Sequence, residues 1–338
     1  MTEPRFLVVR LGSLGDIVHT FPAVAALRES FPKAEIVWLT HPRWKDLVEA
    51  SELATEIWEV ETRAYASVRE ILSRIRKRQF TAAIDYQGLW KSAAIPFLGR
   101  VPRRIGFSSQ SVREFGVPLL YTDRVRITQP HVADQNGELS HRAGSRNGVA
   151  AFQLSLPSLQ EAFALQLLRG LGVDRYVVLS PAGGWRSKCW PPERYGALCQ
   201  QIDTNLGLRC ILNQGPGDEE CIAAVKAASG DAAPVACSSS LHQLMAFLRN
   251  ALCVVAGDTG PLHLAVALGT PVVALFGPTD PARNGPYRPA CDSVKDIVLR
   301  SPRAVSTYKR GDRPDPSLLE LDVATVFDAV RRQVEARR

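Results

Sequence analysis

The chain has 338 residues, of which 46% are hydrophobic and 22% charged, a composition typical of a soluble globular protein. This length exceeds what one ordinary core holds, so we expect two domains. The sequence has no run of about 18 apolar residues, which excludes a transmembrane helix of the usual kind. The opening MTEPRFLVVR carries an early acid and enters a strand pattern at once, so we do not expect a signal peptide.

The net charge of +7 is unevenly distributed, because residues 63–113 hold 11 basic side chains against two acidic ones. Such an excess is either a solvated helix face or a surface for an anionic partner. We find no nucleic-acid-binding motif in the sequence, and we identify no aromatic side chains interleaved with these charges. An anionic lipid or membrane surface suits it equally well.

The seven cysteines all lie from Cys189 onward. They form no C-x-x-C motif, and no histidine is spaced with them as a zinc ligand. We therefore expect buried free thiols in a reducing cytoplasm, rather than disulfides or a metal site.

In the first part of the chain, short apolar runs alternate with amphipathic stretches. Strands are expected at 6–11, 35–40, 56–60, 82–88 and 103–107, and helices at about 16–30, 42–50, 65–79 and 89–98. This βαβα order predicts a parallel sheet with helices on both faces. Residues 122–150 are polar and rich in turn formers, so we expect a loop with one helix around His131–Leu139.

A linker at 155–160 and a helix at about 158–171 precede a second βα series. Its strands are expected at 176–180, 209–215, 233–237, 253–258 and 271–277, and its helices at about 191–206, 217–229, 240–250 and 260–268. A last helix is expected at about 320–336. The whole pattern predicts two doubly wound α/β domains that face each other across a cleft.

Ligands of such sheets bind beyond the carboxyl ends of the strands. That rule brings four loops around one expected site, at Gly12–Asp16, Gly183–Lys188, Gly215–Glu219 and Gly257–His263. Each of these loops follows a predicted strand.

Asp16 stands in the stretch LVVRLGSLGDIVHTFPA, where a helix is expected to begin. An aspartate there can be a cap, since its carboxylate accepts a hydrogen bond from a free amide and complements the helix dipole. It can also be a proton acceptor in catalysis. The stretch by itself leaves both interpretations open.

The stretch SPAGGWRSKCWPPERY, at 180–195, is suited to a phosphate group. Gly183 and Gly184 allow close approach of the backbone, and Lys188 supplies a cation near the start of a helix. An ordinary glycine turn with a solvated lysine is the structural alternative.

A more specific stretch, GDTGPLHLAVALGTPVVALFGPTDP, occupies residues 257–281. The amides of Thr259 and Gly260 lie where a helix begins and can bind phosphate. His263 lies one turn further on. Asp258 can be a helix cap, and a single histidine in a helix is usually structural, so the functional interpretation depends on the whole stretch.

This stretch strongly resembles the C-terminal signature of glycosyltransferase family nine, the bacterial lipopolysaccharide heptosyltransferases. RLGSLGDIVHTFPA at 10–23 resembles the N-terminal signature of that family. Further matches follow in order along nearly the whole chain, in DYQGLWKSA (85–93), RRIGF (103–107), SVRE (111–114) and KCWP (188–191). DYQGLWKSA and HVADQN (131–136) look most like the heptosyltransferase I branch, which adds the first heptose to the inner core.

The resemblance implies a GT-B fold, with an acceptor-binding Rossmann-like domain at 1–155 and a nucleotide-sugar-binding one at 156–319. The C-terminal helix, 320–338, would pack back on the first domain. The implied reaction is an inverting heptosyl transfer from ADP-L-glycero-D-manno-heptose to Kdo-lipid A, with no metal and no other cofactor. The enzyme would act in the cytoplasm, peripherally on the inner membrane, and would bind no nucleic acid.

Matched residue by residue, Asp16 takes the place of the general base and Lys188 that of the phosphate-binding lysine. The implied donor site consists of Gly183, Gly184, Lys188, Glu219, Asp258, Thr259, Gly260 and His263. Glu219 matches the glutamate that holds the nucleotide ribose, with Glu220 and Asp218 as close rivals. Some heptosyltransferases carry hydroxyl residues where this chain has the two glycines, so only backbone amides are expected to serve there.

The acceptor implied by the resemblance is anionic, which gives the basic excess at 63–113 a candidate partner. For its contacts we expect Ser13, Gly15, Arg63, Lys91 and Arg113, with surface solvation as the alternative for the three basic side chains. Asp16 would take the proton of the acceptor hydroxyl while basic groups neutralise the departing ADP. A helix N-terminus lowers the pKa of an aspartate whereas desolvation raises it, so the two effects oppose each other at Asp16.

Three other functions are weighed against this one. A related GT-B glycosyltransferase would use another heptose acceptor or another sugar nucleotide. A dinucleotide-dependent oxidoreductase is disfavoured, because GSLGD lacks the G-x-G-x-x-G spacing. A non-catalytic binding protein would bind ADP without turnover, and the presence of both Asp16 and Lys188 argues against it.

Overall fold

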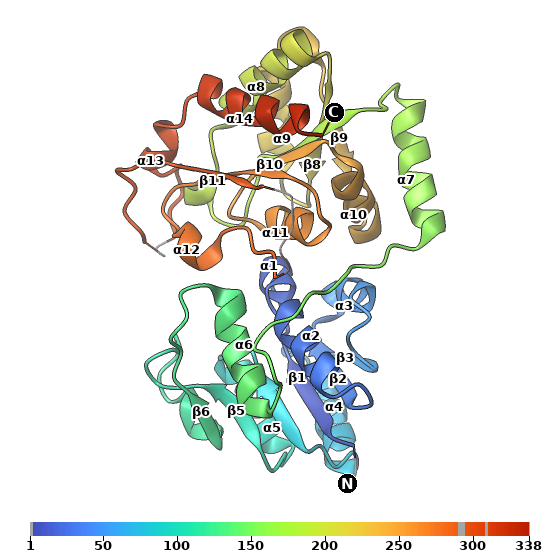
Figure 1. The fold of residues 1–338 in the computed structure, drawn as a ribbon, viewed down its shortest axis with the longest axis vertical. Coiled ribbons are helices and arrows are strands. Elements are labelled where there is room, and N and C mark those ends of the chain that lie inside the picture. The colour runs from blue at the N-terminus through green and yellow to red at the C-terminus, as the bar shows by residue number, and fades with distance from the viewer. Residues whose placement is uncertain (1–2, 290–294, 308–309, 338) are drawn as a thin grey trace. The chain divides into compact units, whose positions relative to one another are not determined.

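The chain divides into two compact units, residues 1–155 and 156–338 (Figure 1). The computed structural model describes residues 3–289, 295–307 and 310–337. The division falls between Ser155 and Leu156, where the sequence analysis places the end of the first domain. Each unit has one six-stranded sheet whose paired strands are parallel, so the predicted doubly wound α/β architecture is confirmed.

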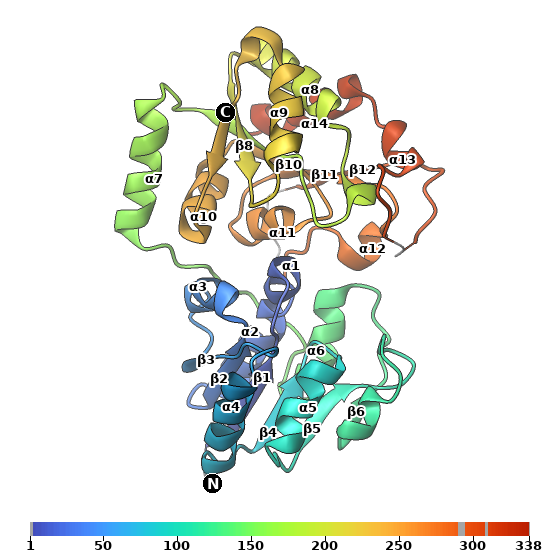
Figure 2. The same cartoon turned by 180° about the vertical axis from the view of Figure 1, so that it is seen from behind.

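The sheet of the first unit has the strand order β3-β2-β1-β4-β5-β6. Its strands are β1 (Arg5–Val9), β2 (Glu35–Thr40), β3 (Glu56–Glu59), β4 (Ala82–Asp85), β5 (Arg104–Phe107) and β6 (Asp123–Val125). Its helices are α1 (Leu14–Val18), α2 (Phe21–Ser30), α3 (Lys45–Ala50), α4 (Tyr65–Lys77), α5 (Trp90–Leu98) and α6 (Val132–Ala143), with 3₁₀ turns η1 (Pro42–Trp44) and η2 (Val117–Leu120). Helices α2 and α6 cover the face seen in Figure 1, and α4 and α5 cover the face seen in Figure 2.

The apolar runs of the sequence explain this packing. β1 is buried from Phe6 to Val9, as expected for a central parallel strand covered by helices on both faces. Ile71 and Ile75 are one helical turn apart and face the sheet, while the charged side chains of α4 lie on its other sides. One core therefore lies between the sheet and the helix pair α4–α5.

The second unit repeats the topology, with the strand order β12-β11-β10-β7-β8-β9. Its strands are β7 (Tyr176–Ser180), β8 (Arg209–Gln214), β9 (Val235–Ser238), β10 (Cys253–Gly257), β11 (Val272–Phe276) and β12 (Ile297–Arg300). Its helices are α7 (Ser158–Gly170), α8 (Pro192–Leu206), α9 (Glu219–Ala227), α10 (Leu241–Asn250), α11 (Gly260–Ala267), α12 (Pro281–Asn284), α13 (Pro316–Leu319) and α14 (Val323–Glu335), with 3₁₀ turns η3 (Arg186–Lys188) and η4 (Gly230–Ala232).

Two local differences from the sequence prediction have clear causes. The single helix expected at 16–30 is two helices, α1 and α2, and Pro22 lies in the first turn of the second, where no amide is needed. The edge strands β6 and β12 were not predicted. They are three and four residues long and only partly buried, so neither presents a buried apolar run.

The C-terminal helix belongs to the second unit. Val326, Val330 and Val334 are four residues apart and form one face of α14, which packs on α8, β10 and β11. The expectation that the helix at 320–338 packs on the first domain is therefore wrong, because its apolar face completes the core of the second unit. Within the described ranges, no helix is both long enough and apolar enough to cross a membrane.

Each sheet changes its winding direction beside its first strand. β1 has β2 on one side and β4 on the other, and β7 lies in the same way between β8 and β10. The crevice at such a reversal, beyond the carboxyl ends of the strands, is where doubly wound sheets bind ligands. The loops after β1 and β4, and those after β7 and β10, are therefore the positions from which a site is built.

Candidate functional site

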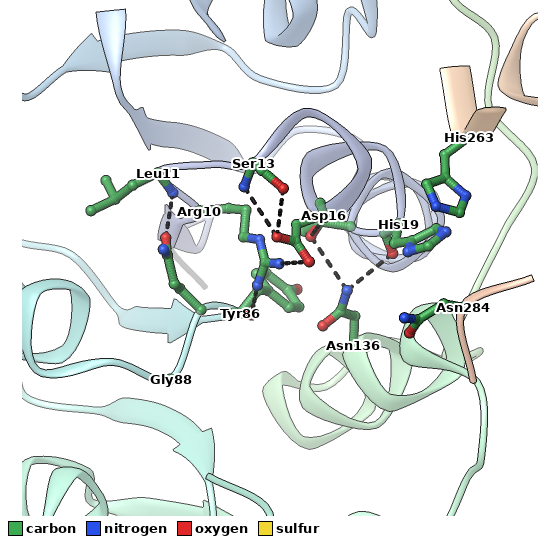
Figure 3. A network of polar contacts seen from close by, with 12 residues as sticks. Arg10, Leu11, Ser13, Asp16, His19, Tyr86, Gly88, Asn136, His263 and Asn284 are labelled. Carbon is green, nitrogen blue, oxygen red and sulfur yellow. Dashed lines mark hydrogen bonds and ion pairs between the residues drawn. The ribbon is translucent and has the colours of Figure 1, made fainter. Parts of the chain in front are cut away.

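An ion pair between Arg10 and Asp16 occupies the reversal point of the first unit (Figure 3). Arg10 Nη2 lies 2.7 Å from Asp16 Oδ1. The Arg10 side chain is buried, and its Nη1 donates to the carbonyl oxygen of Tyr86, directly after β4. Groups at the ends of the two central strands thus fix the guanidinium, which in turn fixes the carboxylate.

Ser13 binds the other oxygen of the same carboxylate. Its amide and its hydroxyl donate to Asp16 Oδ2 at 3.1 and 2.9 Å. Since α1 begins at Leu14, Ser13 is the N-cap and Asp16 is the third helical residue, the position of the acid in a capping box. Asp16 does stabilise the start of the helix, and its side chain nevertheless stays 46% exposed.

The charge state of Asp16 follows from these contacts. Burial favours the neutral carboxyl, but the charge of Arg10, the two hydrogen bonds from Ser13 and the charge of Arg113 outweigh it and lower the pKa of Asp16 below its ordinary value. Asp16 is therefore ionised at neutral pH and can accept a proton. From the sequence, a pKa-lowering effect is expected from the helix terminus alone, and Arg10 is not among the predicted site residues. The available signal was a charged residue ending a buried strand, which needs a partner.

The loops after β1 and β4 hold each other in place. Gln87 Oε1 accepts a hydrogen bond of 2.8 Å from the Leu11 amide. Gly12 has a φ of +155°, and a Cβ there would lie 2.8 Å from Trp44 Nε1, so no larger residue fits without movement. The turn before Asp16 is thus shaped by close packing.

Asp85, in the same region, is a structural residue. It is buried at the end of β4, and its carboxylate accepts hydrogen bonds from Ser92 Oγ at 2.8 Å and from the Tyr121 hydroxyl at 2.7 Å. Burial raises its pKa despite these bonds. The DYQG stretch therefore fixes the β4 loop, which carries the carbonyl that holds Arg10.

The five residues expected to contact an acceptor differ in their positions. Ser13 touches Asp16, Gly15 is buried in α1, and Arg113 acts on the charge of Asp16. Arg63 is exposed in the loop after β3, and Lys91 is exposed in the first turn of α5. The structure thus brings Ser13 into contact with Asp16, and it gives Arg63 and Lys91 surface positions.

In the second unit, a polar cluster forms around Asp258, directly after β10. Lys188 Nζ lies 2.7 Å from Asp258 Oδ2, and His263 Nε2 lies 3.2 Å from Oδ1. Asn284 Nδ2, from α12, donates to Oδ2 at 3.3 Å. One buried carboxylate thus links the loop after β7, helix α11 and helix α12. Asn284 is not among the predicted site residues, because the sequence offers no signal for it.

These partners fix the charges of the cluster. Burial opposes ionisation of Asp258, but its contacts with His263 and Lys188 outweigh that effect and hold its pKa well below the ordinary value. Lys188 Nζ also lies 4.4 Å from the centre of the Trp185 ring, a cation–π distance. The Lys188 ammonium thus contacts both the Asp258 carboxylate and the Trp185 ring. It has three N–H donors, and the hydrogen bond to Asp258 uses one of them.

Two glycines bring the loops after β7 and β10 into direct contact. A Cβ on Gly183 would lie 2.7 Å from Thr259 Cγ2, and one on Gly257 would lie 2.6 Å from the carbonyl oxygen of Lys188. A Cβ on Gly184 would meet nothing within 4 Å. Thr259 is the N-cap of α11, so the first amides of that helix lie beside the Gly183 loop.

The acidic residues at the start of α9 have different partners. Asp218 Oδ2 accepts a 2.8 Å bond from the Gly215 amide within its own loop, and burial raises the Asp218 pKa. Glu220 lies 3.6 Å from Arg186. Glu219 is exposed, and its carboxylate accepts a long bond of 3.3 Å from the Gly217 amide. Of the three acids, Glu219 has the carboxylate least engaged by its surroundings.

The six cysteines in the described ranges are free thiols, at positions 189, 199, 210, 221, 237 and 253. Cys291 lies outside those ranges. Among the described residues, no three His, Cys, Asp or Glu side chains are grouped so that they could hold a metal ion.

Comparison with known proteins assigns the family. The family described as "Glycosyltransferase family 9 (heptosyltransferase)" matches residues 68–308. The chain belongs to glycosyltransferase family 9. It is therefore a glycosyltransferase, as the two signature stretches implied.

Individual relatives in family 9 agree over most of the chain. Lipopolysaccharide heptosyltransferase 1 of Escherichia coli K12 is 29% identical over 316 residues, covering 88% of this chain and 94% of the relative. The enzyme of that name from Pseudomonas aeruginosa is 28% identical over 298 residues, covering 84% and 81%.

Solved structures agree with the observed fold. The ADP-heptose heptosyltransferase II of E. coli superposes with a TM-score of 0.83 at 20% identity, covering 98% of this chain and 99% of that one. E. coli heptosyltransferase WaaC with ADP superposes with a TM-score of 0.73 at 25% identity, covering 98% of each chain. The GT-B fold implied by the family resemblance is thereby confirmed.

Proposed function

We propose that this protein transfers heptose, with inversion, from ADP-L-glycero-D-manno-heptose to Kdo-lipid A in the synthesis of the lipopolysaccharide inner core. Relatives named lipopolysaccharide heptosyltransferase 1 align with most of the chain. The 25% identical WaaC structures contain ADP and ADP-2-deoxy-2-fluoro heptose. The observation that carries the proposal is Asp16, an ionised carboxylate held by Arg10 and Ser13 yet still half exposed.

In this proposal Asp16 is the general base. It takes the proton of the acceptor hydroxyl as that oxygen attacks the anomeric carbon of the donor. Arg10 and Ser13 fix the direction of the carboxylate, which favours a single productive geometry. The lowered pKa weakens the base, and exclusion of water by bound substrates raises that pKa again.

The second unit binds the donor in this proposal. Lys188 and the first amides of α11, at Thr259 and Gly260, neutralise the diphosphate as ADP departs. The amides of Gly183 and Gly184 add contacts to the phosphate groups, which need no side-chain hydroxyl. This set of cations and amides serves the leaving group without a metal ion.

Further side chains hold these groups and the nucleotide in the same proposal. Asp258 and His263 orient Lys188, because the Asp258 carboxylate contacts both His263 and Lys188. Glu219 holds the ribose hydroxyls, since its carboxylate is exposed and weakly engaged.

The first unit binds the acceptor in this proposal. Ser13 and Gly15 border the base, and Arg63, Lys91 and Arg113 pair with the carboxylates and phosphates of Kdo-lipid A. The protein then works in the cytoplasm at the surface of the inner membrane, where such an acceptor is presented, and binds no nucleic acid.

The decisive measurement is ADP release from ADP-heptose, with and without Kdo-lipid A, in the presence of EDTA. We expect release that depends on the acceptor and persists in EDTA. Asp16→Asn keeps a carbonyl oxygen for the Ser13 amide but cannot accept a proton, so it separates the cap from the base. A loss of about 10²–10⁴-fold in kcat with ADP binding retained is expected for this variant.

Other outcomes give different answers. Near wild-type turnover of the Asn variant would leave Asp16 as a helix cap only. A requirement for divalent metal would contradict the proposed donor site. Lipopolysaccharide heptosyltransferase 3 of E. coli is 21% identical over 327 residues, so a longer core acceptor and other sugar nucleotides belong in the same assay. Turnover with one of those alone would replace the proposed substrates.

A further inference from the structure

Five large apolar side chains are exposed on α5, on η2, which packs against α5, and in the loop before η2. They are Trp90, Phe97 and Leu98 of α5, Phe115 in the loop between β5 and η2, and Leu119 of η2, and we call them the α5–η2 patch. Phe115 is 98% exposed and Leu119 is 69% exposed. Single exposed apolar residues are ordinary, whereas a group of them in one place marks an interaction surface.

At the start of α5, Trp90 contacts the loop that carries Phe115. Trp90 Nε1 donates to the Phe115 carbonyl at 3.2 Å. A Cβ on Gly116 would lie 2.9 Å from Trp90 Cζ2, so the indole ring lies on the backbone of this loop. Helix α5 and η2 also share a small buried core that includes Ala93 and Val117.

Arg104 contacts the patch near the end of α5 and also contacts η2. Its guanidinium carbon lies 5.4 Å from the centre of the Phe97 ring, and its Nε donates to the Leu120 carbonyl at 2.8 Å. Arg76, at the end of α4, donates to the Leu98 carbonyl at 3.0 Å. Basic side chains therefore border the apolar ones, although the sequence analysis did not recognise this interleaving.

The charge around the patch is mainly positive. Residues 86–121 contain five basic side chains and a single acid, Glu114, whose carboxylate accepts a 2.6 Å bond from the Trp90 amide. Lys91, Arg100 and Arg113 are exposed. The occupant of this surface must therefore offer both apolar area and negative charge.

The need for negative charge disfavours a second copy of the chain as the occupant of this surface. A two-fold interface would place the same basic surface against itself, and like charges across an interface cost several kcal/mol. A bilayer with anionic lipids meets both requirements, because acyl chains take up aromatic and leucine side chains while phosphates pair with lysine and arginine. Tryptophan is also enriched at the level of the headgroups.

We propose that the α5–η2 patch docks this protein on the surface of a bilayer that contains anionic lipids, with Phe115 and Leu119 inserted among the acyl chains. The inference rests on the proposed function, since an acceptor held in a membrane requires the first unit to reach the lipid surface. Arg113 connects the two, because it lies two residues before Phe115 in the same loop and its charge lowers the pKa of Asp16.

The test is co-sedimentation of the full chain with vesicles of phosphatidylethanolamine and phosphatidylglycerol, without donor or Kdo-lipid A. The double variant Phe115→Ser, Leu119→Ser should bind these vesicles about tenfold more weakly or worse than wild type. The matched control is Leu159→Ser, Phe163→Ser in α7, two similarly exposed apolar side chains of the second unit. It should bind as wild type does, and binding of wild type should fall in high salt and on phosphatidylcholine vesicles.

Several results would overturn the docking proposal. The first is that the wild-type protein does not bind the vesicles. The second is that the patch variant binds them as tightly as wild type does. The third is that the α7 control binds them as weakly as the patch variant does. A dimer in solution that the patch variant dissociates would assign the surface to a second copy instead. Unchanged thermal unfolding and ADP binding of the patch variant exclude a folding defect as the cause of its loss.

The experiment is independent of the proposed reaction, because the vesicles contain neither of its substrates. Vesicle binding without heptosyl transfer would leave docking intact and remove the proposed function. Transfer together with wild-type binding by the patch variant would remove docking alone. If both proposals hold, the patch variant loses activity on Kdo-lipid A in vesicles and keeps it on a deacylated, water-soluble Kdo acceptor.

Discussion

Arg10 is the residue that decides what Asp16 can do. Its guanidinium is buried between the ends of β1 and β4, where it contacts the Tyr86 carbonyl and the Asp16 carboxylate. A buried guanidinium charge requires an ionic partner, so the pair is constrained in position as well as in charge. The cost for catalysis is a weaker base, since the same charge lowers the pKa of Asp16.

The pH dependence of activity tests this arrangement. Because the pKa of Asp16 is lowered, the ionised base persists as pH falls and is lost only below the ordinary range for aspartate. Arg10→Gln removes the charge, so the acid limb of the kcat/KM profile should shift to higher pH. Arg10→Lys keeps the charge and should leave that limb nearly in place. An unshifted limb in the Gln variant, in protein that melts as wild type, would show that Arg10 does not control the base.

At the scale of the elements, the donor cluster depends on how closely two loops approach. The loops after β7 and β10 touch at Gly257, where a Cβ would meet the backbone of Lys188 rather than a movable side chain. That contact fixes the starting point of the Lys188 side chain, whose ammonium reaches Asp258 at 2.7 Å. Glycine is needed there for space.

Gly257→Ala should therefore weaken ADP binding about tenfold and cost about 1–3 kcal/mol of stability, because backbone must move to admit the methyl group. The measurements are ADP titration calorimetry and denaturant unfolding. Gly170→Ala is the control, since a Cβ there meets nothing within 4 Å at the end of α7. Wild-type ADP affinity in Gly257→Ala would mean that this loop contact does not position Lys188.

The elements also show what the sequence could predict. Apolar, β-branched runs such as FLVV in β1 and CVVAG in β10 are fully buried, and their short length and their alternation with amphipathic stretches identify them as strands. The loops that follow them could be placed at the ligand-binding edge for the same reason. The edge strands β6 and β12 could not, because they are short and only partly buried and so have no such pattern.

Contacts between distant residues lay beyond the sequence pattern. The pairing of Arg10 with the Tyr86 carbonyl joins residues 76 positions apart, and Asn284 reaches Asp258 from α12. The sequence predicted a last helix at about 320–336, where α14 spans Val323–Glu335, but it could not indicate which core would receive the apolar face of that helix. That choice is made by tertiary packing, and α14 packs on the second unit.

At the scale of the whole molecule, the two units are built alike and carry different chemistry. Both sheets reverse their winding beside the first strand, and both polar clusters use the loops at that reversal. The first unit holds an anionic carboxylate fixed by arginine, and the second holds an ammonium beside a helix N-terminus. Each cluster is formed by residues of its own unit, and each unit has its own hydrophobic core.

This division predicts that ADP stabilises one unit selectively. In differential scanning calorimetry we expect two transitions, of which ADP raises one, since a ligand stabilises only the folded unit that binds it. At about 100 times Kd the gain is about 2.7 kcal/mol, or roughly 5–10 °C for a unit of this size. Gly257→Ala should lower the same transition, which assigns it to the second unit.

Two variants distinguish the roles of the units in this experiment. Lys188→Gln keeps a hydrogen-bond donor for Asp258 but loses the charge, so the shift caused by ADP should largely disappear. Asp16→Asn should leave the shift intact. Loss of the shift in Asp16→Asn would place nucleotide binding on the first unit, and its survival in Lys188→Gln would remove the lysine from the donor site. A single transition in all variants would mean that the two units unfold together, although each has its own hydrophobic core.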